Sequence, residues 1–87
     1  MQDEKILEQY KTIPLKFSSY YKYVFTFVGE TADGKRIVVS YGGSSDDIYR
    51  WGLSADEIKY IGDDYKEIWR SITIYDGEKE IFEWNDW

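Results

Sequence analysis

Cysteine and histidine are both absent from the 87 residues of this chain. The lack of cysteine excludes disulfide bridges, thiolate metal sites and cysteine nucleophiles. The lack of histidine removes the commonest metal ligand and the usual general base near neutral pH. We therefore expect a protein that is not an enzyme and that uses neither a cofactor nor a metal.

Long apolar runs are also missing. No stretch approaches the roughly 20 apolar residues of a membrane-spanning helix, and the N-terminal sequence MQDEKILEQYK is too polar for a signal peptide. Internal repeats and low-complexity tracts are absent as well. These features predict one small globular domain over residues 1–87, located in the cytoplasm, or in the host cytoplasm if the protein is phage-encoded.

The net charge of −6 is distributed unevenly along the chain. Residues 1–41 contain five acidic and six basic residues, whereas residues 42–87 contain twelve acidic and five basic residues. An acidic field of this kind repels nucleic acid and attracts basic proteins. We therefore expect a basic protein partner, and no direct binding to nucleic acid or to a membrane.

Aromatic residues are abundant, with four Trp, nine Tyr and four Phe. A domain of this size buries only about 60% of the surface that its unfolded chain exposes. Its core is therefore too small to enclose every aromatic side chain, and some of them should lie on the surface. Exposed Tyr and Trp side chains are typical anchors of protein interfaces.

A short helix is the first predicted element, from Asp3 to Ile13. Apolar residues recur at helical spacing from Ile6 to Ile13, and Pro14 disfavours helical backbone at the residue before it. A second short helix is predicted after the capping box at residues 54–57, with Gly62 as its stop. Its apolar residues Ile58 and Ile61 would face the core.

A β-hairpin is predicted over residues 20–41, because two runs of β-branched and aromatic residues flank the turn sequence TADGK. A three-residue loop with Gly34 in the left-handed conformation pairs Thr31 with Lys35. This register gives one apolar face and one face with an opposite-charge pair. Its pairs are Phe25 with Tyr41, Thr26 with Ser40, Phe27 with Val39, Val28 with Val38, Gly29 with Ile37 and Glu30 with Arg36.

A second hairpin is predicted over residues 66–84, with a two-residue turn at Asp76-Gly77. This turn would pair Trp69 with Trp84, Arg70 with Glu83 and Ile72 with Ile81. The predicted order of elements is α-β-β-α-β-β. We therefore expect an α+β fold with one four-stranded antiparallel sheet, built from two β-hairpins, and two short helices.

The sequence GGSSDD at residues 42–47 follows a predicted strand, as a phosphate-binding loop does. A phosphate loop needs a lysine at the start of the following helix, but Asp46 and Asp47 stand near that place and would repel a phosphate. The spacing of an EF-hand calcium loop is also absent. We interpret the stretch as a turn in which Ser45 or Asp46 caps a short helical turn through residues 48–51.

Acidic pairs and aromatic residues alternate between the two predicted hairpins. Either the acids form a solvated surface over buried aromatics, or both together form a protein-binding surface. In the second case the acids speed association and the aromatics act as anchors. The predicted partner-binding residues are Asp46, Asp47, Tyr49, Trp51, Asp56, Glu57, Asp63 and Asp64.

Spaced carboxylates can imitate a nucleic-acid backbone and occupy the groove of a protein that binds DNA or RNA. In size, charge and lack of catalytic residue types, the chain is similar to small phage-encoded inhibitors and to bacterial immunity proteins. We therefore predict a DNA-mimicking inhibitor or immunity-type protein that blocks a basic partner, such as a nuclease. Two alternatives stay open: an aromatic-lined module in which Trp87 and Tyr75 stack a sugar or a nucleotide base, and a structural subunit of a larger assembly.

Overall fold

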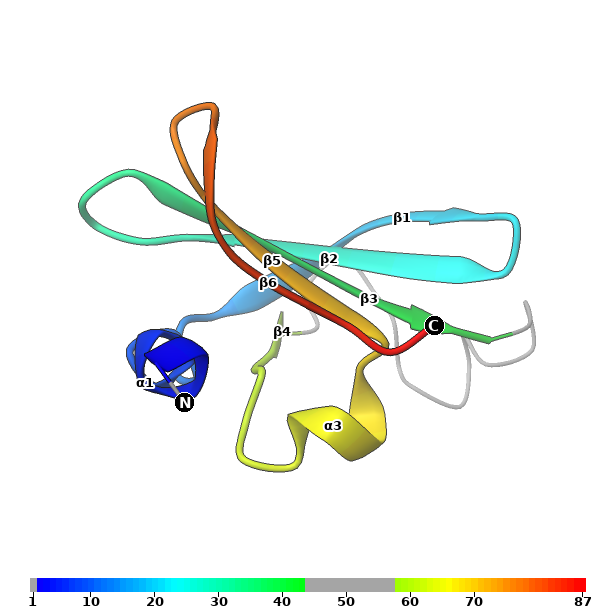
Figure 1. The fold of residues 1–87 in the computed structure, drawn as a ribbon. Coiled ribbons are helices and arrows are strands. Elements are labelled where there is room, and N and C mark those ends of the chain that lie inside the picture. Colours follow the sequence, from blue (N-terminus) through cyan, green and yellow to red (C-terminus); the bar gives the residue numbers. More distant parts are fainter. Residues whose placement is uncertain (1, 44–57) are drawn as a thin grey trace.

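One six-stranded antiparallel sheet forms the body of the protein in the computed structural model, which describes residues 2–43 and 58–87 (Figure 1). The spatial order of the strands is β4-β1-β2-β3-β5-β6. The elements are α1 (Gln2–Glu8), β1 (Leu15–Tyr21), β2 (Val24–Glu30), β3 (Lys35–Gly42), β4 (Ile58–Lys59), α3 (Tyr65–Ile68), β5 (Ser71–Asp76) and β6 (Lys79–Asn85). The fold is therefore mostly β, and the predicted α+β fold with a four-stranded sheet is wrong.

The first correction concerns residues 20–30, which the sequence pattern presents as a single strand. The chain instead reverses at Lys22 and Tyr23, whose φ angles are 50° and 67°. Strands β1 and β2 consequently pair with each other, with Tyr21 opposite Val24. Turns with two positive φ angles are normally marked by Asn-Gly or Asp-Gly. Lys22-Tyr23 is not a typical sequence for such a turn, so the sequence pattern did not predict it.

The predicted helices are also corrected. Helix α1 ends at Glu8 instead of Ile13, and the chain continues in turns, with Tyr10 N donating to Leu7 O at 2.8 Å. The capping box at residues 54–57 lies outside the described residues. Beyond it, Ile58 belongs to strand β4 and is 44% exposed, whereas Ile61 is buried as predicted.

The predicted strand register is observed in the first hairpin but not in the second. In β2–β3 every predicted pair is observed, and Gly34 has the expected positive φ. In β5–β6 the predicted register is wrong, because Ile72 pairs with Trp84 rather than with Ile81. The turn is formed by Gly77 and Glu78, and Ile81 is an extra residue in a β-bulge. Residues 65–68 form helix α3, so that strand β5 begins only at Ser71.

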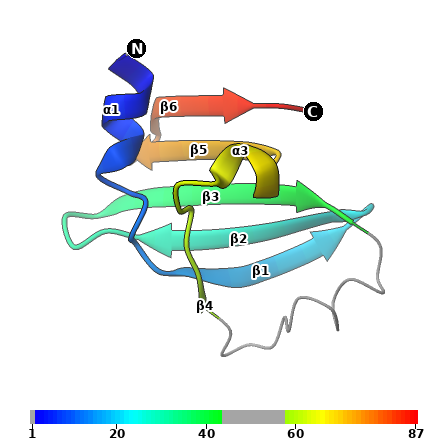
Figure 2. The same cartoon turned by 90° about the horizontal axis from the view of Figure 1, so that it is seen from below.

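The core lies between one face of the sheet and the layer formed by α1 and α3 (Figure 2). Trp69 is the largest fully buried side chain; its Nε1 donates to Ile61 O at 3.2 Å, and its ring meets the Phe27 ring edge-on at 5.4 Å. The other buried core residues are Leu7, Tyr10, Leu15, Phe25, Phe27, Ile37, Val39, Tyr41, Ile61, Tyr65, Ile72, Ile74 and Phe82. No helix within residues 2–43 and 58–87 is long and apolar enough to cross a membrane.

Candidate binding surface

The face of the sheet opposite the core carries neither helix (Figure 1). We call it the open face. Because cross-strand partners on an antiparallel sheet share a face, the register arranges its side chains in rows across the strands. One row contains a small polar side chain from each of five adjacent strands. This hydroxyl row consists of Ser19, Thr26, Ser40, Ser71 and Asn85.

A second row lies beside the hydroxyl row, toward the β1–β2 turn. It consists of Tyr21, Val24 and Gly42, which are cross-strand neighbours. The ring of Trp87 lies over Gly42, with two ring carbons 3.0 and 3.2 Å from the position that a Cβ would take. Tyr21 is 69% exposed and Trp87 is 63% exposed. The sheet thus presents two accessible rings on one face.

The opposite end of the open face is charged. Its rows are Lys16, Val28, Val38, Thr73 and Glu83, and then Glu30, Arg36, Tyr75 and Glu80. The Arg36 guanidinium lies 5.4 Å from the centroid of the Tyr75 ring. Trp87 therefore does not share a site with Tyr75, as the aromatic-module alternative supposed, and its neighbour across the face is Tyr21.

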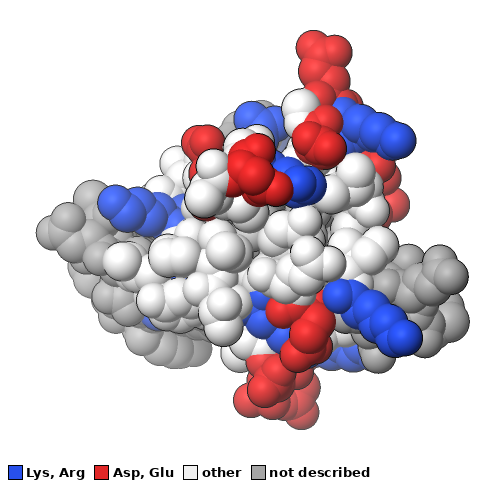
Figure 3. Space-filling model, turned by 90° about the vertical axis from the view of Figure 1, so that its left-hand side faces the viewer, with Lys and Arg blue, Asp and Glu red and all other residues white. Residues whose placement is uncertain are grey.

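Acidic side chains border the open face along strand β6. In a regular strand, Glu80 and Glu83 would point to opposite faces, because successive side chains alternate. The bulge at Ile81 instead places both on the open face, opposite Tyr75 and Thr73. We call Glu78, Glu80 and Glu83 the acidic edge. Figure 3 shows acidic side chains at the top of the view, at the level of the β5–β6 turn in Figure 1.

Only two of the eight predicted partner-binding residues, Asp63 and Asp64, lie within the described chain. Both are exposed in the segment before α3, on the core side of the sheet. Asp63 forms an ion pair with Lys11 at 3.2 Å, and the carboxylates of Glu8 and Asp63 raise the pKa of Lys11. The structure therefore separates this acidic pair from the open face. Asp46, Asp47, Tyr49, Trp51, Asp56 and Glu57 lie outside the described residues.

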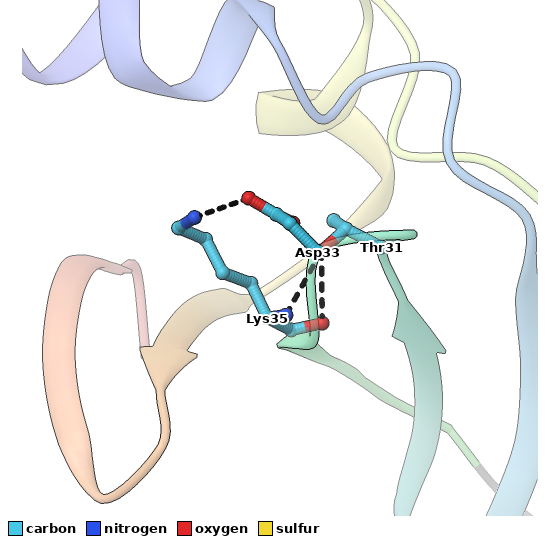
Figure 4. Close-up of polar contacts among 3 residues, drawn as sticks. All are labelled: Thr31, Asp33 and Lys35. Atoms are coloured by element: carbon cyan, nitrogen blue, oxygen red, sulfur yellow. Dashed lines mark hydrogen bonds and ion pairs between the residues drawn. The ribbon is translucent and has the colours of Figure 1, made fainter.

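The turn between β2 and β3 contains the one strongly shifted carboxyl group of the described chain. Asp33 accepts hydrogen bonds from Lys35 Nζ at 2.5 Å and from Thr31 Oγ1 (Figure 4). These bonds lower the pKa of Asp33 from 3.8 to about 2. A carboxylate held ionised in this way stabilises the turn and is a poor general base, because its affinity for protons is low.

An open pocket of about 480 Å³ adjoins this turn, between α1 and strand β6. Its apolar lining comes from Ile6, Tyr10, Ile13 and Ile81. Asp33, which is paired with Lys35, lies at this pocket as well. Among the side chains that the structure describes, in residues 5–43 and 58–87, no three acidic groups are placed so that they could hold a metal ion. The pocket thus offers an apolar surface and a neutralised ion pair.

Comparison with known proteins adds no family to this description. No protein-family model matches the chain, no curated protein is similar to it in sequence, and no solved structure matches its fold.

Proposed function

We propose that this chain is a non-enzymatic acidic binding domain of the inhibitor or immunity type. It would block a basic partner, such as a nuclease, by occupying the groove in which that partner binds nucleic acid. The observation that carries the proposal is the acidic edge. Glu80 and Glu83 are exposed on the open face, which carries neither α1 nor α3, and neither forms an ion pair with a residue of the described chain.

Several other carboxylates form ion pairs with basic residues of the same chain. Lys11 pairs with Glu8 and Asp63, Lys35 pairs with Asp33, and Arg70 pairs with Asp86. A carboxylate that is not paired within its own chain can attract the Lys and Arg side chains of a partner. Such complementarity acts mainly on the association rate, and salt weakens it.

Three double charge reversals test the proposal, because each changes the net charge of the chain by the same amount. They are Asp46→Lys with Asp47→Lys, Asp63→Lys with Asp64→Lys, and Glu80→Lys with Glu83→Lys. Each variant and the wild type are immobilised, partners are captured from a bacterial lysate at low salt, and association with the isolated partner is measured by surface plasmon resonance.

The Glu80/Glu83 reversal should slow association by roughly tenfold or more and should flatten its dependence on salt. The Asp63/Asp64 reversal should have a smaller effect, because Asp63 is already paired with Lys11 on the other side of the sheet. Reversal of Asp46 and Asp47 tests the acids predicted from the sequence. If all three variants bind like the wild type, or if all three lose binding equally, a defined acidic surface does not exist.

A further inference from the structure

Tyr21 and Trp87 stand on the same face of the sheet and in the same row, with Val24 between them. Tyr21 belongs to β1, and Trp87 lies over Gly42 of β3. Since neighbouring strands are about 4.8 Å apart, the two positions are roughly 10 Å apart. This distance allows one extended ligand to contact both rings.

The backbone that carries each ring is ordered. The Trp87 ring rests on Gly42, and the Trp87 backbone N donates to Asn85 Oδ1 at 2.9 Å. The preceding residue, Asp86, donates its backbone N to Arg70 O at 2.8 Å. Tyr21 adjoins the tight β1–β2 turn, where Lys22 Nζ lies 5.3 Å from the ring centroid. Because the backbone under both rings is ordered, a ligand that binds there has to order only the side chains, which limits the loss of conformational entropy.

The hydroxyl row runs parallel to this aromatic pair, two residues further along each strand. Ser40 is buried, and its hydroxyl group is hydrogen-bonded to that of Ser71. Ser19 and Asn85, at the two ends of the row, are exposed. The row crosses five strands, a width of roughly 19 Å. A ligand that lies across the strands can therefore stack on the rings and reach the exposed polar groups at the ends of the row, Ser19 and Asn85.

The charges around the aromatic pair and the hydroxyl row favour a neutral ligand over an anionic one. Neither the hydroxyl row nor the set of Tyr21, Val24, Gly42 and Trp87 contains a charged side chain, although Lys22 lies beside the Tyr21 ring. The net charge of −6 opposes an anionic ligand such as a nucleic acid. A sugar ring is neutral, has an apolar face that packs on an aromatic ring, and carries hydroxyl groups at its edge.

We infer that the Tyr21–Trp87 pair and the hydroxyl row form a binding site for a neutral oligosaccharide, which lies across strands β1 to β6. This activity is separate from the proposed binding of a basic protein. It depends on stacking and hydrogen bonds between uncharged groups, so salt should leave it nearly unchanged, whereas binding at the acidic edge should weaken with salt.

The test uses three soluble hexasaccharides as probes: cellohexaose, maltohexaose and chitohexaose. Binding is followed by tryptophan fluorescence and by isothermal titration calorimetry at low and high salt. The variants are Trp87→Ala, Tyr21→Ala and the conservative Trp87→Phe, with circular dichroism as a check of folding. Tyr60→Ala is the matched control, because Tyr60 is 50% exposed and lies outside the open face.

At least one probe should bind saturably at both salt concentrations. Trp87→Ala and Tyr21→Ala should each weaken binding by roughly tenfold, the usual effect of losing one stacked ring. Trp87→Phe and Tyr60→Ala should remain close to the wild type. Failure of all three probes at millimolar concentration would overturn the inference. An equal loss of binding affinity in Tyr60→Ala would also overturn it. The same holds if light scattering shows a dimer that Trp87→Ala dissociates, because a second copy of the chain would then cover the open face.

Discussion

Gly29→Ala probes the contact between the sheet and the segment that leads from α1 into β1. Gly29 lies in β2, and a Cβ added there would be 2.6 Å from the backbone oxygen of Pro14 and 2.8 Å from Leu15 Cδ2. Ordinary contact begins near 3.4 Å, and a backbone oxygen cannot rotate away. Overpacking of this kind costs about 1–3 kcal/mol. The reduced entropy of the unfolded chain offsets about 0.4–1 kcal/mol, so a net loss of about 1–2 kcal/mol is expected.

Gly42→Ala is the matched control, because it is the same substitution on the neighbouring strand of the same sheet. There the close contacts of a Cβ would be with the ring of Trp87, at 3.0 and 3.2 Å, and this exposed side chain can turn aside. The backbone oxygen of Tyr23, at 3.8 Å, lies at an ordinary contact distance. Its free energy of unfolding should change by less than about 0.5 kcal/mol. The free energy of unfolding of both variants is measured by urea and thermal denaturation, followed by far-UV circular dichroism. The Tm of Gly29→Ala should fall by roughly 5–15 °C. Equal stability of the two variants would refute the packing argument.

Three further substitutions test other parts of the fold. Trp69→Ala should lower the free energy of unfolding by about 3–5 kcal/mol, because it empties the largest buried site; a loss below 1 kcal/mol in urea denaturation would contradict the core described above. Replacing Lys22 and Tyr23 by Asn-Gly should raise the free energy of unfolding by about 1–2 kcal/mol, since both residues have positive φ angles, which Asn and Gly adopt more easily. An unchanged Tm would show that the Lys22–Tyr23 turn is not strained. The folded pKa of Asp33 is about 2, below its usual 3.8, so its contribution is present above pH 4 and is lost as the pH falls toward 2. Asp33→Asn should therefore flatten the pH dependence of Tm across this interval, and an unaltered profile would show that the carboxylate contributes nothing.

The β2–β3 hairpin could be predicted because independent local signals agree there. The Asp33-Gly34 turn, the alternation of apolar residues and the opposite charges of Glu30 and Arg36 all specify one register. The β5–β6 hairpin lacks this agreement. Gly77 fits a two-residue turn at either of its positions, and the bulge at Ile81 shifts every pair beyond it. Local sequence patterns contain no signal for such a bulge.

The open face was less predictable than the hairpins, because it depends on pairings between strands far apart in sequence. Tyr21 and Trp87 become neighbours only after β1 is recognised as a strand and Trp87 folds back onto Gly42. The acidic edge was missed for a similar reason, since alternation alone sends Glu80 and Glu83 to opposite faces. Charge and composition predicted an acidic chain with exposed aromatics, but not where on the fold these side chains meet.

The most direct test of the proposed function is whether the captured partner can bind this chain and nucleic acid at the same time. A fluorescently labelled DNA or RNA duplex is bound to the purified partner at low salt, and its anisotropy is followed as the chain is added. The account predicts that the wild type displaces the duplex, and that the Glu80/Glu83 reversal and high salt both weaken the displacement. A stable complex that retains the duplex, with anisotropy undiminished when the chain saturates the partner, would contradict it.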